Sequence, residues 1–197
     1  MVVIGVIGPI AAGKSVVLDE LDRLGAITIR ADEVSRALLR PGEALLEQVI
    51  AEFGETYRRE VGGLDRAKLG TLVFADDQAR RRLERIMHPA MVRRIAEEIE
   101  QARASAAPAV AVEAANLVEM GALPLVDITV MVAAPRPIRL RRLMRRDGLS
   151  RDEAGRRLAL HDRLGIAGHK ADYRIDASDG ESRTRRRTER LWRELVQ

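Results

Sequence analysis

Short apolar runs alternate with amphipathic stretches along most of this chain, which is the pattern of strands separated by helices. Residues 2–7 are rich in β-branched side chains and predict a buried strand, and residues 15–24 carry apolar positions at helical spacing. Further elements are expected as strands at 26–29, 109–114, 128–133 and 174–176 and as a C-terminal helix at 183–196. Buried strands joined by helices are typical of a parallel α/β sheet.

The segment between the second and third expected strands is too long for one crossover helix. Its pattern is mainly helical, with interruptions expected at Pro41-Gly42, Gly62-Gly63 and His88-Pro89. We therefore expect one domain in three parts, with ligands at the carboxyl ends of the strands. The parts are a core of about 1–32, 105–135 and 170–197, a helical substrate-binding insert of about 33–104, and an arginine-rich lid of about 136–169.

Composition narrows the class of protein. The 197 residues suit one domain, and the absence of cysteine excludes disulfides and thiolate metal sites. The first apolar run is too short for a membrane span or a signal peptide, so we expect a cytoplasmic protein. Lysine occurs only three times, so 31 of the 34 basic residues are arginine. Arginine suits phosphate recognition, although a genomic composition bias would give the same excess.

The strongest motif is a phosphate-binding loop. Gly8-Pro9-Ile10-Ala11-Ala12-Gly13-Lys14-Ser15 matches G-x-x-x-x-G-K-[ST], with an expected strand before it and a helix after it. Glycines let the backbone wrap around phosphate oxygens, and the N–H groups of the loop and helix start favour anions. The motif predicts ATP and Mg²⁺ as cofactors, with Lys14 on the β- and γ-phosphates and Ser15 on Mg²⁺. The expected ATP-binding residues are Gly8, Ala11, Ala12, Gly13, Lys14, Ser15 and Val16.

Two absences favour a small kinase over other proteins with this loop. The apolar run at 110–112 ends in Glu113 instead of the usual magnesium-binding aspartate, and the chain lacks the guanine-reading N-K-x-D motif. Asp32 follows the second expected strand, at the same edge as the phosphate loop. Its carboxylate would orient an acceptor hydroxyl and take its proton, or it would cap the helix that follows.

The remaining motifs resemble one family, the dephospho-CoA kinases, in order and spacing through most of the chain. After the phosphate loop, the matching pieces are Gly25-Ala26, Ala31-Asp32 and Arg36; Pro41-Gly42; Phe53-Gly54; Leu64-Asp65-Arg66 with Leu69 and Val73-Phe74; Leu83-Glu84 with Ile86 and His88-Pro89; Leu117-Val118-Glu119; Val126-Asp127; Arg142-Leu143 with Arg146-Asp147; and Arg157-Leu158.

The resemblance implies a P-loop kinase with a helical substrate-binding insert and a lid. It implies transfer of the ATP γ-phosphoryl group to the 3′-hydroxyl of dephospho-coenzyme A, the last step of coenzyme A biosynthesis. In that family the residues matching Asp32 and Lys14 are catalytic, and those matching Arg142 and Arg146 close over ATP. The implied substrate-binding residues are Asp32, Arg36, Arg66, His88 and Glu119.

Four positions depart from the family pattern. Arg30 replaces an aspartate, Asn116 a leucine, His161 a glutamine and Ala177 an asparagine. By strand alternation Arg30 would share a face with Asp32 and favour its ionised carboxylate. These departures spare the ATP site but leave open a kinase for another nucleotide-like or small alcohol acceptor.

Two alternatives of other classes stay open. The basic balance and two arginine clusters, at 136–157 and 183–193, suit a nucleic-acid-binding ATPase, although the scarcity of aromatic residues disfavours base stacking. A solvated helix face would explain the second cluster equally well. A relative that binds nucleotide without catalysis is the third reading. His88 suits a structural hydrogen bond as well as catalysis, three isolated histidines make a metal site improbable, and no feature indicates an oligomeric state.

Overall fold

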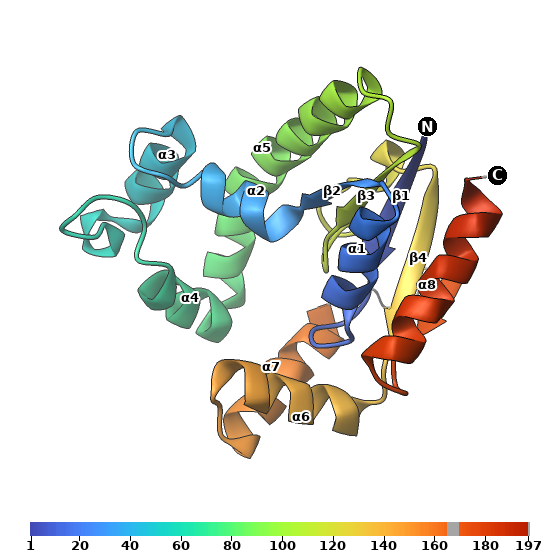
Figure 1. The fold of residues 1–197 in the computed structure, drawn as a ribbon. Coiled ribbons are helices and arrows are strands. Elements are labelled where there is room, and N and C mark those ends of the chain that lie inside the picture. The colour runs from blue at the N-terminus through green and yellow to red at the C-terminus, as the bar shows by residue number, and fades with distance from the viewer. Residues whose placement is uncertain (165–169, 197) are drawn as a thin grey trace. The chain divides into compact units, whose positions relative to one another are not determined.

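A five-stranded parallel sheet forms the centre of the fold, in the order β2-β3-β1-β4-β5 (Figure 1). The computed structural model describes residues 1–164 and 170–196, and side chains other than those of residues 163 and 164 within these ranges. The strands are β1 (Val2–Ile7), β2 (Ile27–Arg30), β3 (Ala109–Glu113), β4 (Ile128–Ala133) and β5 (Tyr173–Asp176). The predicted parallel α/β sheet is confirmed, with each strand within two residues of its expected place at either end.

The helices fall into two compact units of the chain. One unit holds residues 1–30 and 98–197, and the other holds residues 31–97. The first contains α1 (Lys14–Arg23), η2 (Leu123–Leu125), α6 (Arg136–Asp147), α7 (Arg151–Leu164) and α8 (Glu181–Leu195). The second contains α2 (Ala31–Ala37), α3 (Ala44–Phe53), η1 (Glu55–Tyr57), α4 (Arg66–Ala75) and most of α5 (Asp77–Arg103).

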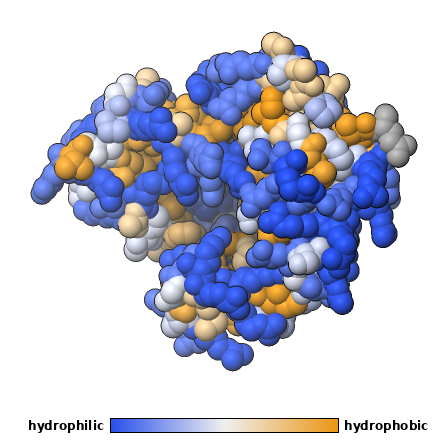
Figure 2. All heavy atoms as spheres, in the orientation of Figure 1, coloured by the Kyte–Doolittle hydropathy of each residue, from blue (hydrophilic) through white to orange (hydrophobic). Residues whose placement is uncertain are grey.

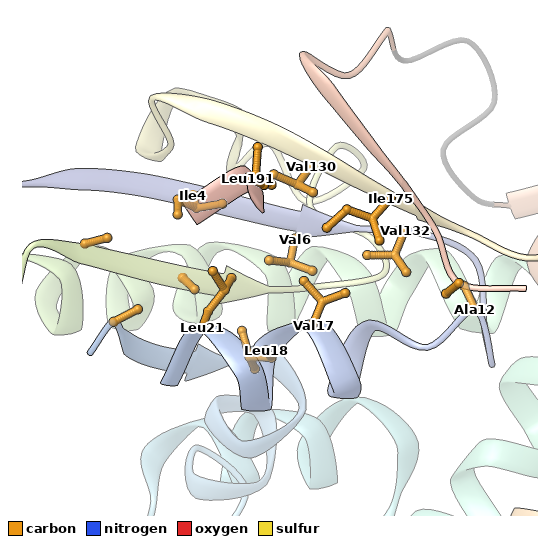
Figure 3. Close-up of a cluster of buried hydrophobic side chains, with 14 residues drawn as sticks. Ile4, Val6, Ala12, Val17, Leu18, Leu21, Val130, Val132, Ile175 and Leu191 are labelled. Carbon is orange, nitrogen blue, oxygen red and sulfur yellow. The ribbon is translucent and has the colours of Figure 1, made fainter. Parts of the chain in front are cut away.

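Helices α1 and α8 supply apolar side chains to one core with the sheet (Figure 3). Val17, Leu18 and Leu21 of α1 pack with β-strand residues such as Ile4 and Val130, and Leu191 joins them from α8. The spacing of these α1 residues matches the turn of a helix, which explains why the pattern of this segment predicted a helix. Hydrophilic residues cover the visible face of α8 (Figure 2).

A buried carboxylate ties α1 to α8 beside this core. The Glu20 side chain is only 1 % exposed. It accepts hydrogen bonds from Arg23 of α1 at 2.5 and 2.8 Å and from Arg185 of α8 at 2.9 Å. These bonds, Arg23 first, hold the pKa of Glu20 below its usual value against the opposing effect of burial.

In the second unit, one arginine holds two helical elements together. Arg58 pairs with Glu47 of α3 at 2.8 and 2.9 Å and with Glu55 of η1 at 2.7 Å. The Tyr57 ring packs edge-on against Phe53 and lies under the Lys68 ammonium. This unit is thus organised by ion pairs and ring contacts as well as by apolar burial.

Three local expectations were wrong. Helix α5 continues through Pro89, although His88-Pro89 was expected to interrupt it. A proline removes one hydrogen bond, which the remaining bonds of a 27-residue helix outweigh. Strand β2 ends at Arg30, so Asp32 lies in the first turn of α2 and is not the residue that caps it. Strand alternation therefore does not relate Arg30 to Asp32.

Candidate active site

The phosphate loop joins β1 to α1, and its glycines are required by close contacts. A Cβ atom on Gly8 would lie 2.3 Å from the Val132 carbonyl oxygen of neighbouring β4, which only glycine avoids. Gly13 precedes α1 with φ of 109°, in the left-handed region. The backbone from Gly8 to Gly13 is thus held against the sheet while its last residues open the helix, which aims free N–H groups at an anion.

Lys14 is folded over this loop. Its side chain is 9 % exposed, and Nζ donates to the Gly8 carbonyl at 3.0 Å. The same Nζ lies 3.6 Å from Oε1 of Glu113, the last residue of β3. Strand β3 is the neighbour of β1, with Val6 opposite Glu113, so the pairing follows from the sheet register.

Glu113 is a candidate site residue that the sequence motifs do not identify. An apolar strand that ends in an acid delivers a carboxylate to the ligand edge of the sheet, which is the sequence signal for this residue. The signal is weak because the usual residue at such a position is aspartate. With Glu113 beside Lys14, the phosphate loop faces one carboxylate and the exposed hydroxyl-bearing residue Ser15.

This donor set fits Mg²⁺. Magnesium binds nucleotides through one or two protein oxygens and keeps several waters, so Ser15 and Glu113 suffice with phosphate oxygens. Among the residues that the structure describes, no group of three or more acidic, histidine or cysteine side chains is placed to hold a metal ion alone.

Arg142 of α6 bridges three segments of the first unit. Its guanidinium donates to the Ala12 carbonyl at 2.8 Å, to the Ala11 carbonyl at 3.5 Å and to the Ala177 carbonyl at 2.6 Å. Ala177 follows β5 and is buried. Arg142 therefore lies at the phosphate loop, where it holds backbone groups in place.

Three other arginines of α6 and α7, Arg139, Arg146 and Arg157, form ion pairs within these two helices. Arg146 donates to its neighbour Asp147 at 2.7 Å, and Arg157 of α7 lies 3.4 Å from the same carboxylate. Hydrogen bonding and charge from Arg146 hold the pKa of Asp147 below its usual value. Arg139 joins α6 to Asp162 of α7 through two bonds of 2.8 and 3.0 Å. The two lid helices are thus cross-linked by ion pairs.

The second unit brings together three of the predicted acceptor residues. Arg66 at the start of α4 lies 3.4 Å from the Ser35 hydroxyl of α2. Burial and the charge of Arg36 lower the pKa of Arg66, while Asp32 acts in the opposite direction. All three residues thus belong to the second unit, and both Asp32 and Arg36 act on the charge of Arg66.

The remaining predicted residues lie on other elements. His88 is half-buried on α5, where burial lowers its pKa and Glu84 acts against that shift. Glu119 is exposed in the segment after β3. His161 lies on α7, whereas His169 and the last part of the predicted lid fall outside the described residues. Arg30 donates to Asp19 of α1 at 2.6 Å.

The second arginine cluster lines a shallow groove along α8. Its members are Arg183, Arg186, Arg187 and Arg190. All four belong to one helix, and Arg183 and Arg187 both lie near Asp179, at 3.8 and 2.6 Å. The groove is therefore the space between side chains of one helix face, which is the solvated-face alternative given for this cluster from the sequence.

Comparison with known proteins agrees with this geometry. The family model for dephospho-CoA kinase matches residues 2–179. A dephospho-CoA kinase of Geobacter sulfurreducens is 40 % identical over 193 residues, covering 98 % of each chain. The structure of TT1252 from Thermus thermophilus superposes with a TM-score of 0.76 at 28 % identity, covering 100 % of this chain and 98 % of the other.

A dephospho-CoA kinase from Campylobacter jejuni gives a TM-score of 0.71 at 26 % identity, covering 98 % of this chain and 96 % of the other. In the part of the chain that the structure describes, no helix is long and apolar enough to cross a membrane. The matching spans cover the phosphate loop, both units and the lid, so the likeness is to a whole kinase and not to its nucleotide site alone. The chain belongs to the dephospho-CoA kinase family.

Proposed function

We propose that this protein transfers the γ-phosphoryl group of ATP to the 3′-hydroxyl of dephospho-coenzyme A, giving coenzyme A and ADP. The observation that carries the proposal is Lys14, which is folded over the phosphate loop and paired with Glu113, in a chain of this family. The reaction forms a bond from the acceptor oxygen to the γ-phosphorus and breaks the bond to the oxygen that leaves with ADP. The acceptor's proton goes to a base.

Each step of the reaction has a residue suited to it. Lys14 and the loop N–H groups offset charge on the transferred phosphoryl group, which is the main catalytic demand in such reactions. Asp32 orients the acceptor hydroxyl and takes its proton. Arg36 and Arg66 hold anionic groups of the acceptor through their guanidinium groups. The charge effects of Asp32 and Arg36 on Arg66 support this assignment. His88 and Glu119 complete the proposed acceptor contacts.

On the donor side, Gly8, Ala11, Ala12, Gly13 and Val16 bind ATP through the backbone, and Arg142 and Arg146 approach it from the lid. Ser15 and Glu113 would hold Mg²⁺, which would neutralise phosphate charge and help to orient the γ-phosphoryl group. Arg142 contributes by fixing the loop, because its donors already bind backbone carbonyls. The reaction uses soluble substrates, and we place it in the cytoplasm.

The direct test is coupled ADP release from Mg-ATP over a panel of acceptors. The panel should hold dephospho-coenzyme A, adenosine, a nucleoside monophosphate, shikimate and water alone. The proposal expects turnover with dephospho-coenzyme A at least tenfold above every other acceptor. Equal or greater turnover with another alcohol would reassign the acceptor, and ADP release without any acceptor would indicate an ATPase.

A further inference from the structure

The lid helices α6 and α7 share a small apolar core that includes part of the phosphate loop. Leu143, Ala154 and Leu158 are fully buried there. Ile10 and Ala11, from the middle of the loop, pack against this core. These two positions are unconstrained in the phosphate-loop motif, because the loop binds phosphate through its backbone. Their side chains are therefore free to serve the lid.

The backbone of Ala11 supports this reading. It has φ of 59°, the only positive φ of a residue other than glycine among the described residues. A glycine would adopt this conformation without steric cost. We therefore infer that packing of the Ala11 methyl group offsets the backbone strain. In the structure this residue packs against the lid core.

Arg142 makes a second connection between the same parts. It extends from α6 to the Ala11 and Ala12 carbonyls, and its other branch reaches the Ala177 carbonyl beyond β5. It also lies close under Gly13, where a Cβ atom would be 3.3 Å from its Nη1 atom. A lid movement that keeps these bonds must move the loop backbone, and a change in loop conformation must likewise move α6.

From this geometry we infer that Ile10 and Ala11, with Arg142, are positioning residues that couple the phosphate loop to the lid. Nucleotide on the loop then biases the lid through apolar packing and carbonyl bonds, before any lid arginine meets a phosphate. The inference rests on the ATP-binding half of the proposed function and not on the acceptor. Such coupling is reciprocal. If nucleotide stabilises the lid by a given factor, loss of the attachment between loop and lid must lower the affinity for nucleotide by the same factor.

The test compares the full chain with Ile10→Ala by hydrogen exchange and by kinetics. Peptides from residues 136–164 should exchange more slowly in the wild type when a non-hydrolysable ATP analogue is added. In Ile10→Ala the same slowing should need about fivefold or more analogue, within the usual range of allosteric coupling. The KM for ATP should rise by a similar factor, while the KM for dephospho-coenzyme A stays unchanged. Ile27→Ala, on edge strand β2, is the matched control and should show neither effect.

Arg142→Lys is the companion variant, because a lysine cannot span two carbonyls as the guanidinium fork does. Like Ile10→Ala, it should need more analogue for the slowing of exchange in residues 136–164, and it should raise the KM for ATP. Thermal midpoints show whether a variant is unfolded. If Ile10→Ala is unfolded, Ile10→Val, which removes only one methylene, replaces it in the test. It should show a smaller shift of the same sign in lid exchange and in the KM for ATP.

Unchanged KM for ATP and unchanged lid exchange in folded Ile10→Ala and Ile10→Val would overturn the inference. Hydrogen exchange with the analogue requires no acceptor. A protein that shows the coupling but does not phosphorylate dephospho-coenzyme A would therefore contradict only the proposed function.

Discussion

Lys14 Nζ and Glu113 Oε1 lie 3.6 Å apart. Lys14 is the first residue of α1, which follows β1, and Glu113 is the last residue of β3, the neighbour of β1 in the sheet. The pair places a cation and a carboxylate at the mouth of the phosphate loop. In the proposed reaction, Glu113 would help to hold Mg²⁺ and Lys14 would offset phosphate charge, so one ion pair links two groups proposed for the donor side.

Glu113→Gln tests this link. The amide keeps the shape of the side chain but loses the charge that Mg²⁺ prefers. We expect the Mg²⁺ concentration for half-maximal activity to rise, with turnover reduced about 10- to 100-fold, as for other groups that support a metal. Glu181→Gln, an exposed glutamate on α8, is the control. A normal magnesium dependence in Glu113→Gln would remove Glu113 from the site.

Asp32→Asn tests the proposed base. The change keeps most hydrogen bonding but removes the proton acceptor, so transfer should fall by roughly 10²–10⁴. The loss should lie toward the lower end, because the loose transition state does not need early deprotonation of the acceptor. ATP affinity and the thermal midpoint should stay unchanged. Full turnover in a normally stable variant would send the search for the base to Glu119.

Much of this donor site was predictable from the sequence. The phosphate loop is a local motif in which strand, turn and helix follow one another, so Lys14, Ser15 and the glycines were identified directly. Arg142 was expected from the family resemblance, but its bonds to the Ala12 and Ala177 carbonyls and the pairing of Glu113 with Lys14 needed the tertiary structure, because these partners come from separate segments of the chain. The packing of Ile10 on the lid core left no signal, since its motif position accepts any residue.

The failures at Pro89 and Asp32 have a different cause. The rules that predict a helix break at proline, or a cap at aspartate, describe short segments. A long helix outweighs the local cost at Pro89, and the turn from β2 into α2 occurs directly after Arg30, without a connecting loop. In both places the arrangement of the helices and strands overrides the local sequence preference.

Glu20→Gln tests the buried carboxylate between α1 and α8. It leaves the guanidinium groups of Arg23 and Arg185 without their anion and should lower the free energy of unfolding by about 1–3 kcal/mol at neutral pH. Because the folded-state pKa of Glu20 is lowered, its contribution is fully present above the unfolded pKa near 4.5 and is lost as the pH falls through the folded value.

The stability difference between wild type and Glu20→Gln should therefore shrink on acidification below about pH 4.5. Urea unfolding at pH 7 and at pH 4 measures it, with the exposed Glu194→Gln as control. A difference that grows on acidification would have the wrong sign for a carboxylate stabilised by two arginines.

Arg30→Asp tests whether the departure from the family pattern affects the acceptor. The Arg30 guanidinium already pairs with Asp19 of α1 at 2.6 Å, so we expect the ranking of acceptors to stay the same. The thermal midpoint should fall slightly, since a partly exposed pair contributes about 1 kcal/mol or less. Arg30→Lys keeps the charge and serves as control. A shift of selectivity toward dephospho-coenzyme A would show that Arg30 restricts the acceptor.

We propose that a site containing Lys14 phosphorylates one hydroxyl, the 3′-hydroxyl of dephospho-coenzyme A. The most direct measurement is mass spectrometry with ³¹P NMR of the product from dephospho-coenzyme A and Mg-ATP, using wild type and Lys14→Ala side by side. We predict that the wild type forms coenzyme A, in which the 3′-position carries the transferred phosphate. We also predict a rate lower by about 10²–10³ in Lys14→Ala, whose fold should be intact. No 3′-phosphorylated product from the wild type, or equal rates from the two proteins, would contradict this proposal.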